Sequence, residues 1–341
     1  MSKLTSLARG SLEAGSIRTY TPGLHKFTAF VEDVCASIGR PPWAHGTTQQ
    51  LRELVSTRGV VEAFIAYAHD DGLRAETIKV YISALKYFGT DGFGRPALPD
   101  KLGVKRILQG CIKMQGPPKE GKLGIGIHRL RKLVAYLGVH PRWSAYEKTL
   151  WKAMVCCAFF AASRVSEYLE TVDEVKLLTL EKVRRLDNGG MRFWLYKTKN
   201  NSVGRPQEVD FPRLTEEPTC PSKALTDFLE IRRETKVNEP LFIDERGRHV
   251  CPERFNDKLR QLMAVIEPDL KGRFTSKSFR IGMTSDAFAL RVEEVDMRML
   301  GRWAPGSTAY LSYVMSLARA ERAAGVQRQV AQMGRNSEKC F

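Results

Sequence analysis

A segment rich in glycine, proline and charged residues, GPPKEGKLGIG at 116–126, divides the chain into two parts. This composition is typical of a linker, because glycine and proline favour turns and end regular elements. The 341 residues are enough for two domains of ordinary size. We therefore predict an N-terminal domain over 17–115, a C-terminal domain over 127–341, and a loose polar arm over 1–16.

The same segment contains the pattern G-x-x-x-x-G-K, which is close to a phosphate-binding loop. Position 123 is leucine, so the hydroxyl that would bind magnesium is missing, and no strand precedes the segment. We therefore expect no nucleotide cofactor.

The N-terminal part has the spacing of amphipathic helices. In ETIKVYISALKYFG at 76–89, apolar residues recur at helical spacing, whereas Lys79, Ser83 and Lys86 share the opposite face. That polar face is either a solvated surface or a stripe that contacts phosphates. Similar helical patterns cover 22–39, 59–72 and 102–115.

The C-terminal part mixes helical and strand patterns. An apolar helix is expected over 143–163, strands over 175–180 and 191–199, and a return strand over 208–211 after a turn at 200–204. Further helices are expected over 223–234, 253–266 and 277–290. The predicted fold class is therefore mainly α with a small antiparallel β-sheet: a helical domain followed by an α+β domain with a C-terminal tail helix.

The charge of the chain points to a polyanionic partner. The formal net charge is +16, for which nucleic acid is the first candidate and an anionic membrane surface the second. No apolar run reaches the roughly 18 residues of a membrane span, and no N-terminal signal is visible. The seven cysteines are scattered without C-x-x-C, and the histidines form no ligand motif. We therefore expect reduced thiols inside a cell and no metal site.

Four short motifs follow one another in the C-terminal part: RVSE at 164–167, KSFR at 277–280, GRW at 301–303, and then a tyrosine. In this order and spacing they resemble the catalytic domain of the tyrosine recombinases. The segments RTYTPGLHKFTAF and LRAETIKVYISAL are similar to the helical core-binding domain of the same family. G-R-W followed by A-Y-x-x-Y most resembles the crypton and DIRS-like mobile-element group.

The resemblance implies roles for the basic residues. Arg164 and Arg280 would stabilise the charge on a five-coordinate phosphorus, because guanidinium groups are always charged and match phosphate oxygens. Glu167, within helical reach, would hold Arg164. Lys277 stands where the family usually has histidine and would act as a cationic donor. Trp303 would donate its indole N–H to phosphate and pack behind the tyrosine.

Two choices stay open at the nucleophile and the general acid. The family places its tyrosine eight or nine residues after the Trp position, whereas Tyr310 and Tyr313 follow Trp303 by seven and ten. The A-Y-x-x-Y pattern favours Tyr313 as the nucleophile. In the hairpin, Lys199 is preferred over Lys197 as the donor of a proton to the leaving 5′ oxygen.

The sequence thus predicts a site-specific recombinase or integrase that cuts and rejoins double-stranded DNA without metal or cofactor, through a 3′-phosphotyrosine. The resemblance implies four protomers on two DNA sites, in the nucleus of a eukaryotic host or otherwise in the cytoplasm or nucleoid. The alternatives are a type IB topoisomerase-like enzyme and a catalytically silent DNA-binding protein derived from a mobile element.

Overall fold

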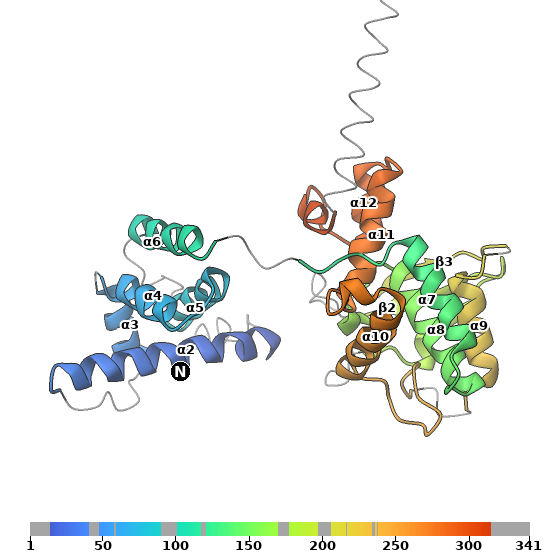
Figure 1. Cartoon of the computed structure of the whole chain (residues 1–341), viewed down its shortest axis with the longest axis horizontal. Coiled ribbons are helices and arrows are strands. Elements are labelled where there is room, and N and C mark those ends of the chain that lie inside the picture. The colour runs from blue at the N-terminus through green and yellow to red at the C-terminus, as the bar shows by residue number, and fades with distance from the viewer. Residues whose placement is uncertain are drawn as a thin grey trace, which may run out of the picture. The chain divides into compact units, whose positions relative to one another are not determined.

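The computed structural model describes residues 14–40, 48–57, 59–89, 101–116, 121–169, 177–196, 206–215, 217–233, 236 and 238–314. The chain divides into two units, Met1–Glu120 and Gly121–Phe341, and each is described by itself. Figure 1 labels the helices and strands of both units. No helix in the described ranges is both long and apolar enough to cross a membrane.

The first unit is helical in its described part. Its elements are α2 (Ala14–Ser37), α3 (Thr48–Ser56), α4 (Val60–Asp70), α5 (Ala75–Phe88) and α6 (Lys101–Met114). The predicted spacing in α5 is confirmed, because Ile78, Ile82 and Leu85 are buried whereas the predicted polar face is exposed. Helix α3 lies between the predicted helical segments, in a stretch for which none was expected.

Close contacts lock α5 to its neighbours. Helix α2 crosses α5 at Gly23, where a Cβ atom would lie 2.9 Å from the Cα of Tyr81. Just beyond α6, the Gln115 side chain accepts a hydrogen bond from the backbone N–H of Ala75 at 2.9 Å and donates one to the carbonyl of Leu73 at 2.7 Å. The side chain therefore caps the start of α5, whose first N–H groups have no partner within the helix.

The second unit surrounds one buried helix. Its elements are α7 (Ile127–Val139), α8 (Ala145–Phe160), η1 (Val165–Glu167), η2 (Leu180–Lys182), β1 (Val183–Arg185), β2 (Met191–Leu195), β3 (Gln207–Phe211), α9 (Pro221–Ile231), α10 (Pro252–Ile266), η3 (Pro268–Leu270), α11 (Lys277–Ala289), α12 (Glu294–Gly301) and η4 (Ala309–Tyr313). Helix α8 packs against α7, α9 and α11. Its residues Leu150 to Phe159 are buried except Lys152, as the apolar sequence predicts.

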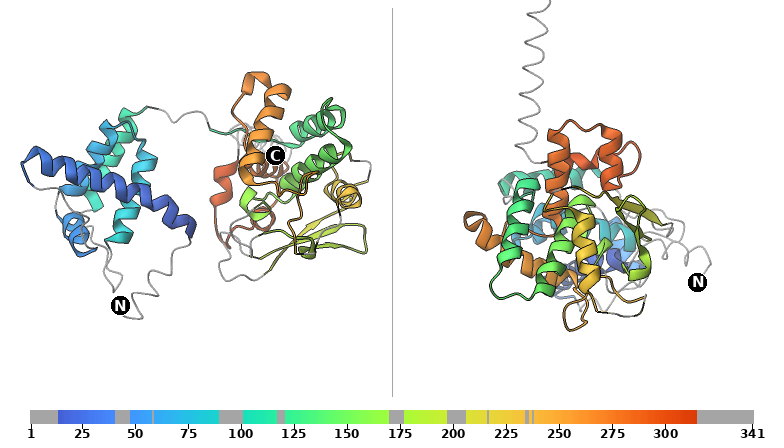
Figure 2. Two further views of the ribbon diagram at one scale, coloured as in Figure 1. Left: turned by 90° about the horizontal axis from the view of Figure 1, so that it is seen from below. Right: turned by 90° about the vertical axis from the view of Figure 1, so that its right-hand side faces the viewer.

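The strands form an antiparallel sheet in the order β1-β2-β3. Figure 2 shows the strands, in yellow-green, along one side of the second unit and the helices on the other. Along β2, Met191, Phe193 and Leu195 are buried, whereas Arg192 is turned outward and pairs with Asp210 of β3. This alternation is the period of two that a half-buried strand requires.

The predicted hairpin of β2 and β3 is confirmed, and so is the fold class: mainly α with a small antiparallel sheet. The predicted strand at 175–180 is wrong over its described residues. Thr179 forms only an isolated bridge with Pro240, and a 3₁₀ turn follows before β1 begins at Val183. The sequence of β1, VRR, is charged and short, so it lacks the alternating apolar residues on which a strand prediction rests.

Residues 121–126, the end of the predicted linker, pack against α11. The backbone N–H of Ile125 donates to the carbonyl of Ser278 at 2.8 Å, and a Cβ on Gly282 would lie 1.9 Å from the carbonyl oxygen of Ile125. The Asp286 carboxylate then accepts the backbone N–H of Ile127 at 2.7 Å and caps α7. Helix α11 is therefore held at several points along its length.

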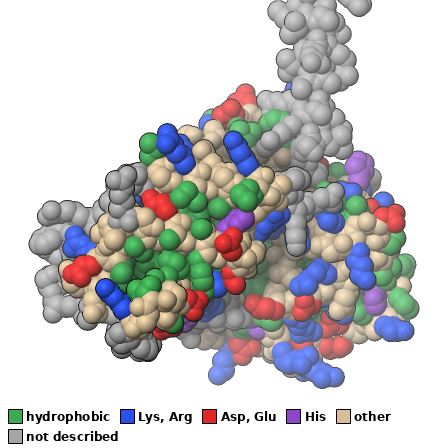
Figure 3. Space-filling view, turned by 60° about the vertical axis from the view of Figure 1, so that its left-hand side comes forward, with side chains coloured by type: hydrophobic (Ala, Val, Ile, Leu, Met, Phe, Trp, Pro, Cys, Tyr) green, Lys and Arg blue, Asp and Glu red, His purple; other side chains and the backbone are tan. Residues whose placement is uncertain are grey.

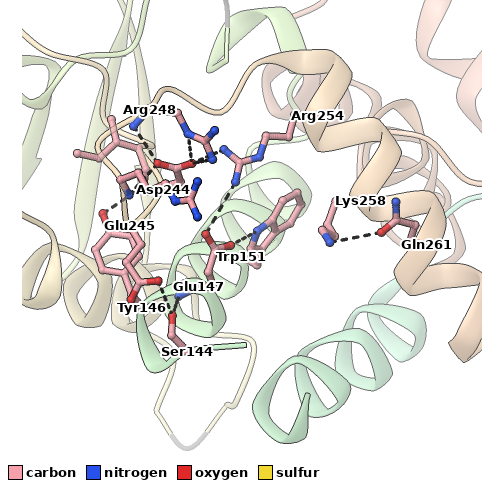
Figure 4. Close-up of polar contacts among 12 residues, drawn as sticks. Ser144, Tyr146, Glu147, Trp151, Asp244, Glu245, Arg248, Arg254, Lys258 and Gln261 are labelled. Atoms are coloured by element: carbon pink, nitrogen blue, oxygen red, sulfur yellow. Dashed lines mark hydrogen bonds and ion pairs between the residues drawn. The ribbon is translucent and has the colours of Figure 1, made fainter. Parts of the chain in front are cut away.

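A buried carboxylate anchors the loop between α9 and α10 (Figure 4). Asp244 accepts hydrogen bonds from the backbone N–H of Arg248 at 2.8 Å and from Arg254 Nη1 at 2.7 Å. Burial alone would raise the pKa of Asp244, but these donors outweigh it and lower the pKa to about 2. Arg254 also lies 3.8 Å from Glu147 of α8, which accepts the indole N–H of Trp151.

Candidate active site

Helix α11 presents two cations to the ring of Tyr313. Lys277 is the first residue of α11 and is exposed, whereas Arg280, one turn later, is 1% exposed. Residues three apart share a helical face. Lys277 Nζ lies 5.2 Å and Arg280 Cζ 5.1 Å from the centroid of the Tyr313 ring. A phenol thus lies beside two positive charges.

The GRW motif forms a tight turn at the end of α12. A Cβ on Gly301 would lie 1.8 Å from Cζ3 of Trp303, so only glycine fits there. Arg302 follows in the left-handed conformation, with φ 54° and ψ 43°. The chain then turns back, and the buried Trp303 ring stacks on the Arg280 guanidinium, with Cζ 4.2 Å from the ring centroid.

The two candidate tyrosines differ in burial. They lie in the 3₁₀ turn η4, in which residues three apart share a side. Both rings contact Trp303, with centroids 6.1 Å away for Tyr310 and 5.7 Å for Tyr313. Tyr310 is 3% exposed and packs with Ala287 and Met297, whereas Tyr313 is partly exposed beside the cations. Of the two, Tyr313 is the residue whose ring is accessible from solvent.

Arg164 follows α8 after the short loop at 161–163 and is held by Glu167. Arg164 Nη1 donates to Glu167 Oε1 at 2.8 Å, and the backbone N–H of Arg164 donates to Oε2 at 3.2 Å. Burial alone would raise the pKa of Glu167, but the Arg302 and Arg164 guanidinium groups outweigh it and hold the pKa below its ordinary value. The charged carboxylate therefore fixes Arg164, whose side chain is 25% exposed.

Arg280 connects the loop after α8 to the end of α12. Nη1 donates to the carbonyl of Ala162 and Nη2 to the carbonyl of Gly301, each at 2.7 Å. Its Nε–H is buried without a hydrogen-bond partner, and such a donor favours the approach of an acceptor. Burial and the Arg164 charge lower the pKa of Arg280, although an arginine stays charged at neutral pH.

The structure thus gathers most of the residues that the sequence singles out in this unit. Those brought together are Arg164, Glu167, Lys277, Arg280, Trp303 and Tyr313. Lys199 and its alternative Lys197 lie outside the described residues. Sequence reasoning misses Arg302, which stands there only as a letter of the GRW motif, and no periodicity or spacing signals the contacts that it makes.

Possible metal ligands do not converge in the described ranges. They hold no group of three or more His, Cys, Asp or Glu side chains that could bind a metal ion. The described cysteines are free thiols, and burial raises the pKa of Cys156 to about 12.

The first unit exposes two lysines on one face of α5. Lys79, Ser83 and Lys86 are exposed along α5. Next to Tyr81 of that helix, α2 lines an open groove of about 670 Å³ with Arg18, His25 and Lys26 among its residues. Figure 3 shows lysine and arginine side chains spread among acidic ones on the visible face.

Comparison with solved structures shows the fold. No protein-family model matches the sequence, and no curated protein matches it. The XerH site-specific recombinase, bound to its palindromic difH substrate after cleavage, is similar with 15% identity and a TM-score of 0.62, over 92% of this chain and 80% of that one. The Tn1549 transposon integrase with transposon right-end DNA has 12% identity and a TM-score of 0.60, over 96% and 98%.

A lambda integrase dimer bound to a COC′ core site is also similar, with 13% identity and a TM-score of 0.54, over 93% of this chain and 76% of that chain. The class that these comparisons define is the tyrosine recombinase and integrase fold. At such low identity the likeness establishes the fold, and the activity of this chain must be argued from its own residues.

Proposed function

We propose that the chain is a site-specific recombinase or integrase that cuts and rejoins double-stranded DNA through a 3′-phosphotyrosine. The observation that carries this proposal is the position of the partly exposed Tyr313 ring, about 5 Å from both Lys277 and Arg280. The fold supports it, since the similar structures of XerH, the Tn1549 integrase and lambda integrase are bound to DNA.

In the proposed step, Tyr313 Oη forms a bond to the phosphorus and the bond from phosphorus to the 5′ oxygen breaks. The phenol gives its proton to solvent water, and the leaving oxygen gains a proton, for which Lys199 is the proposed donor. The reverse attack by the 5′ hydroxyl restores the phosphodiester and the tyrosine. Bond energy is conserved in the phosphotyrosine, so resealing needs no nucleotide.

The cationic cluster would stabilise the transition state. Negative charge grows on the non-bridging oxygens, and Arg164, Arg280 and Lys277 supply positive charge around one phenol. Preorganised donors of this kind are worth more than in water, because they need no reorganisation during reaction. Trp303 would support the Tyr313 ring from behind and offer its indole N–H.

Both units would contact DNA in this proposal. Exposed Lys79, Ser83 and Lys86 suit a phosphate backbone. We also propose assembly of four protomers on two sites, a mobile-element origin of the crypton or DIRS-like kind, and action wherever the host keeps its DNA.

The test is covalent trapping on nicked fragments of genomic DNA, followed by denaturation and sequencing of captured ends. Wild-type protein and the matched variant Tyr310→Phe are expected to give protein–DNA adducts, and Tyr313→Phe none. The released ends should accept a 5′ label without prior dephosphorylation, and a chelator should change nothing. An adduct that survives Tyr313→Phe contradicts the proposal.

One observation favours a second candidate, a DNA-binding protein without cleavage activity. Arg280 is 1% exposed, and both of its terminal nitrogens already donate to backbone carbonyls. In that case all variants would shift DNA to the same extent in a salt-dependent way, and no adduct would form.

A further inference from the structure

We propose that Arg302 is a positioning residue, which holds the loop before Arg164 and balances Glu167 so that Arg164 remains available to phosphate. The inference rests on the proposed function and assigns a role to a residue that the motifs leave without one. Its support comes from the contacts of Arg302, its backbone conformation and the charge of the cluster.

The Arg302 side chain is almost enclosed by the loop at 161–163. Nη1 donates to the carbonyl of Ala161 at 2.9 Å, and Nη2 donates to Ser163 Oγ at 3.1 Å and to Glu167 Oε2 at 2.5 Å. Only 11% of the side chain is exposed. One guanidinium therefore ties together three groups that flank Arg164 in sequence.

The loop itself needs such support. Ala162 has φ 44°, a left-handed conformation that L-residues rarely adopt. The carbonyl of Ala161 accepts a hydrogen bond from Arg302, and the carbonyl of Ala162 accepts one from Arg280. A strained residue persists only where its surroundings over-determine it, so these two arginines set the direction in which Arg164 leaves the loop.

The backbone of Arg302 supports the same role. It is the first residue after α12 and has φ 54°, a position that glycine fills most easily. An arginine at this position adopts an unfavourable backbone conformation, and its three side-chain hydrogen bonds compensate for that strain.

The charge of the cluster also depends on Arg302. The groups that face Glu167 are the guanidiniums of Arg302, Arg164 and Arg280. With all three, the cluster of four side chains has a net charge of +2. Without Arg302, the carboxylate pairs mainly with Arg164, and the net charge falls to +1. A phosphate would then compete with Glu167 for the same guanidinium.

The first experiment removes the side chain without straining the backbone. Arg302→Gly introduces the residue best suited to a left-handed position. Arg291→Gly is the matched control, because Arg291 also has positive φ, 60°, at the end of α11, and is exposed. The rate of adduct formation should fall about 100-fold in Arg302→Gly, as misplaced reacting groups typically cause, and stay near wild type in Arg291→Gly.

A pH profile separates positioning from a general loss of structure. In wild type, the two guanidiniums keep the pKa of Glu167 low against the effect of burial. Removing one lets burial dominate, so the acid limb of the rate should move up by about 1–3 pH units in Arg302→Gly. Arg302→Lys keeps the charge and should keep the limb near its wild-type pH. If Arg302→Gly does not fold, Arg302→Gln against Arg302→Lys makes the same comparison.

A third measurement does not depend on cleavage. Because the pKa of Glu167 is lowered in the folded state, its stabilising effect is present at neutral pH and is lost as pH falls through the folded pKa. In Arg302→Gly, burial should instead raise the folded pKa of Glu167 above its ordinary value, so protonation of Glu167 should stabilise the fold and this loss should be absent. Arg291→Gly should still show the loss, as followed by thermal unfolding from pH 7 to pH 3. If the wild-type protein forms no adduct, that result refutes the proposed function but not the role of Arg302. An Arg302→Gly protein with the rate, acid limb and unfolding profile of Arg291→Gly would overturn the role of Arg302.

Discussion

Gly301→Ala is the substitution whose effect on stability the structure predicts most directly. The added methyl would lie 1.8, 2.2 and 2.3 Å from three ring atoms of Trp303, whereas carbon atoms that touch stay about 3.5–4.0 Å apart. The ring cannot simply withdraw, because Arg280 stacks on it and both tyrosines of η4 pack against it.

The magnitude follows from two opposing effects. Alanine gains about 0.5–1 kcal/mol over glycine within a helix, whereas overpacking a buried site costs about 1–3 kcal/mol. Complete expulsion of the ring would approach the cost of deleting it, about 3–5 kcal/mol. After the helical gain is subtracted, the net effect lies between these two limits, and we expect Gly301→Ala to lower the free energy of unfolding by about 1–3 kcal/mol. Gly138→Ala in α7, where a Cβ meets nothing within 4 Å, should raise it slightly.

The assay is urea unfolding of the full chain, followed by tryptophan fluorescence and near-ultraviolet circular dichroism. The two variants make the same chemical change in helices of the same unit. Changes of opposite sign in the free energy of unfolding would therefore be due to the contact with Trp303 alone. The displaced ring should also disturb the support of Tyr313 and slow adduct formation. A Gly301→Ala protein as stable as Gly138→Ala would refute the packing of Trp303 over Gly301.

Three further predictions test charge. Arg164→Ala should slow adduct formation by about 10²–10³-fold, the usual effect of losing one transition-state donor, with DNA affinity at fixed salt much less affected. The pKa of Asp244 is lowered to about 2, so the ionised carboxylate stabilises the fold at any pH above the ordinary carboxyl pKa. Unfolding measured from pH 5 to pH 2 should show that the free energy of unfolding falls by about 2 kcal/mol between about pH 4 and pH 2. Asp244→Asn should lack this pH-dependent loss and should be less stable than wild type at pH 7. Replacing Lys79 and Lys86 by alanine should lower the salt slope of DNA binding by about one unit for each phosphate that the variant no longer neutralises, whereas an unchanged slope would assign that face of α5 to solvent.

Much of the fold could be predicted because its signals are local. The spacing of Ile78, Ile82 and Leu85 identifies α5, and the unbroken apolar run identifies the buried α8. Helix α12 escaped prediction because it is short and exposes Val295 and Met299, so its pattern carries little amphipathic signal. Strand β1 escaped because pairing with β2, rather than its own composition, makes it a strand.

The residues of the candidate site also divide into those that local sequence patterns identify and those that only the folded structure reveals. Motif order identifies the residues that lie around Tyr313, since each belongs to a recognisable short pattern. The burial that separates Tyr310 from Tyr313 depends on packing with Ala287 and Met297, which spacing cannot reveal. Arg302 was out of reach for the same reason, because its partner Glu167 is distant in sequence and the two meet only in the folded chain.

The loop at 161–163 has a consequence for synthesis of the protein. Its carbonyls are held by Arg280 and Arg302, which leave the ribosome well after the loop itself. A growing chain can therefore form the helices of its first unit while the direction of Arg164 is still unset. The cluster around the phenol is completed only when the last of its members has been made. A chain that stops before the GRW turn lacks Arg302, one of the two arginines that hold the loop.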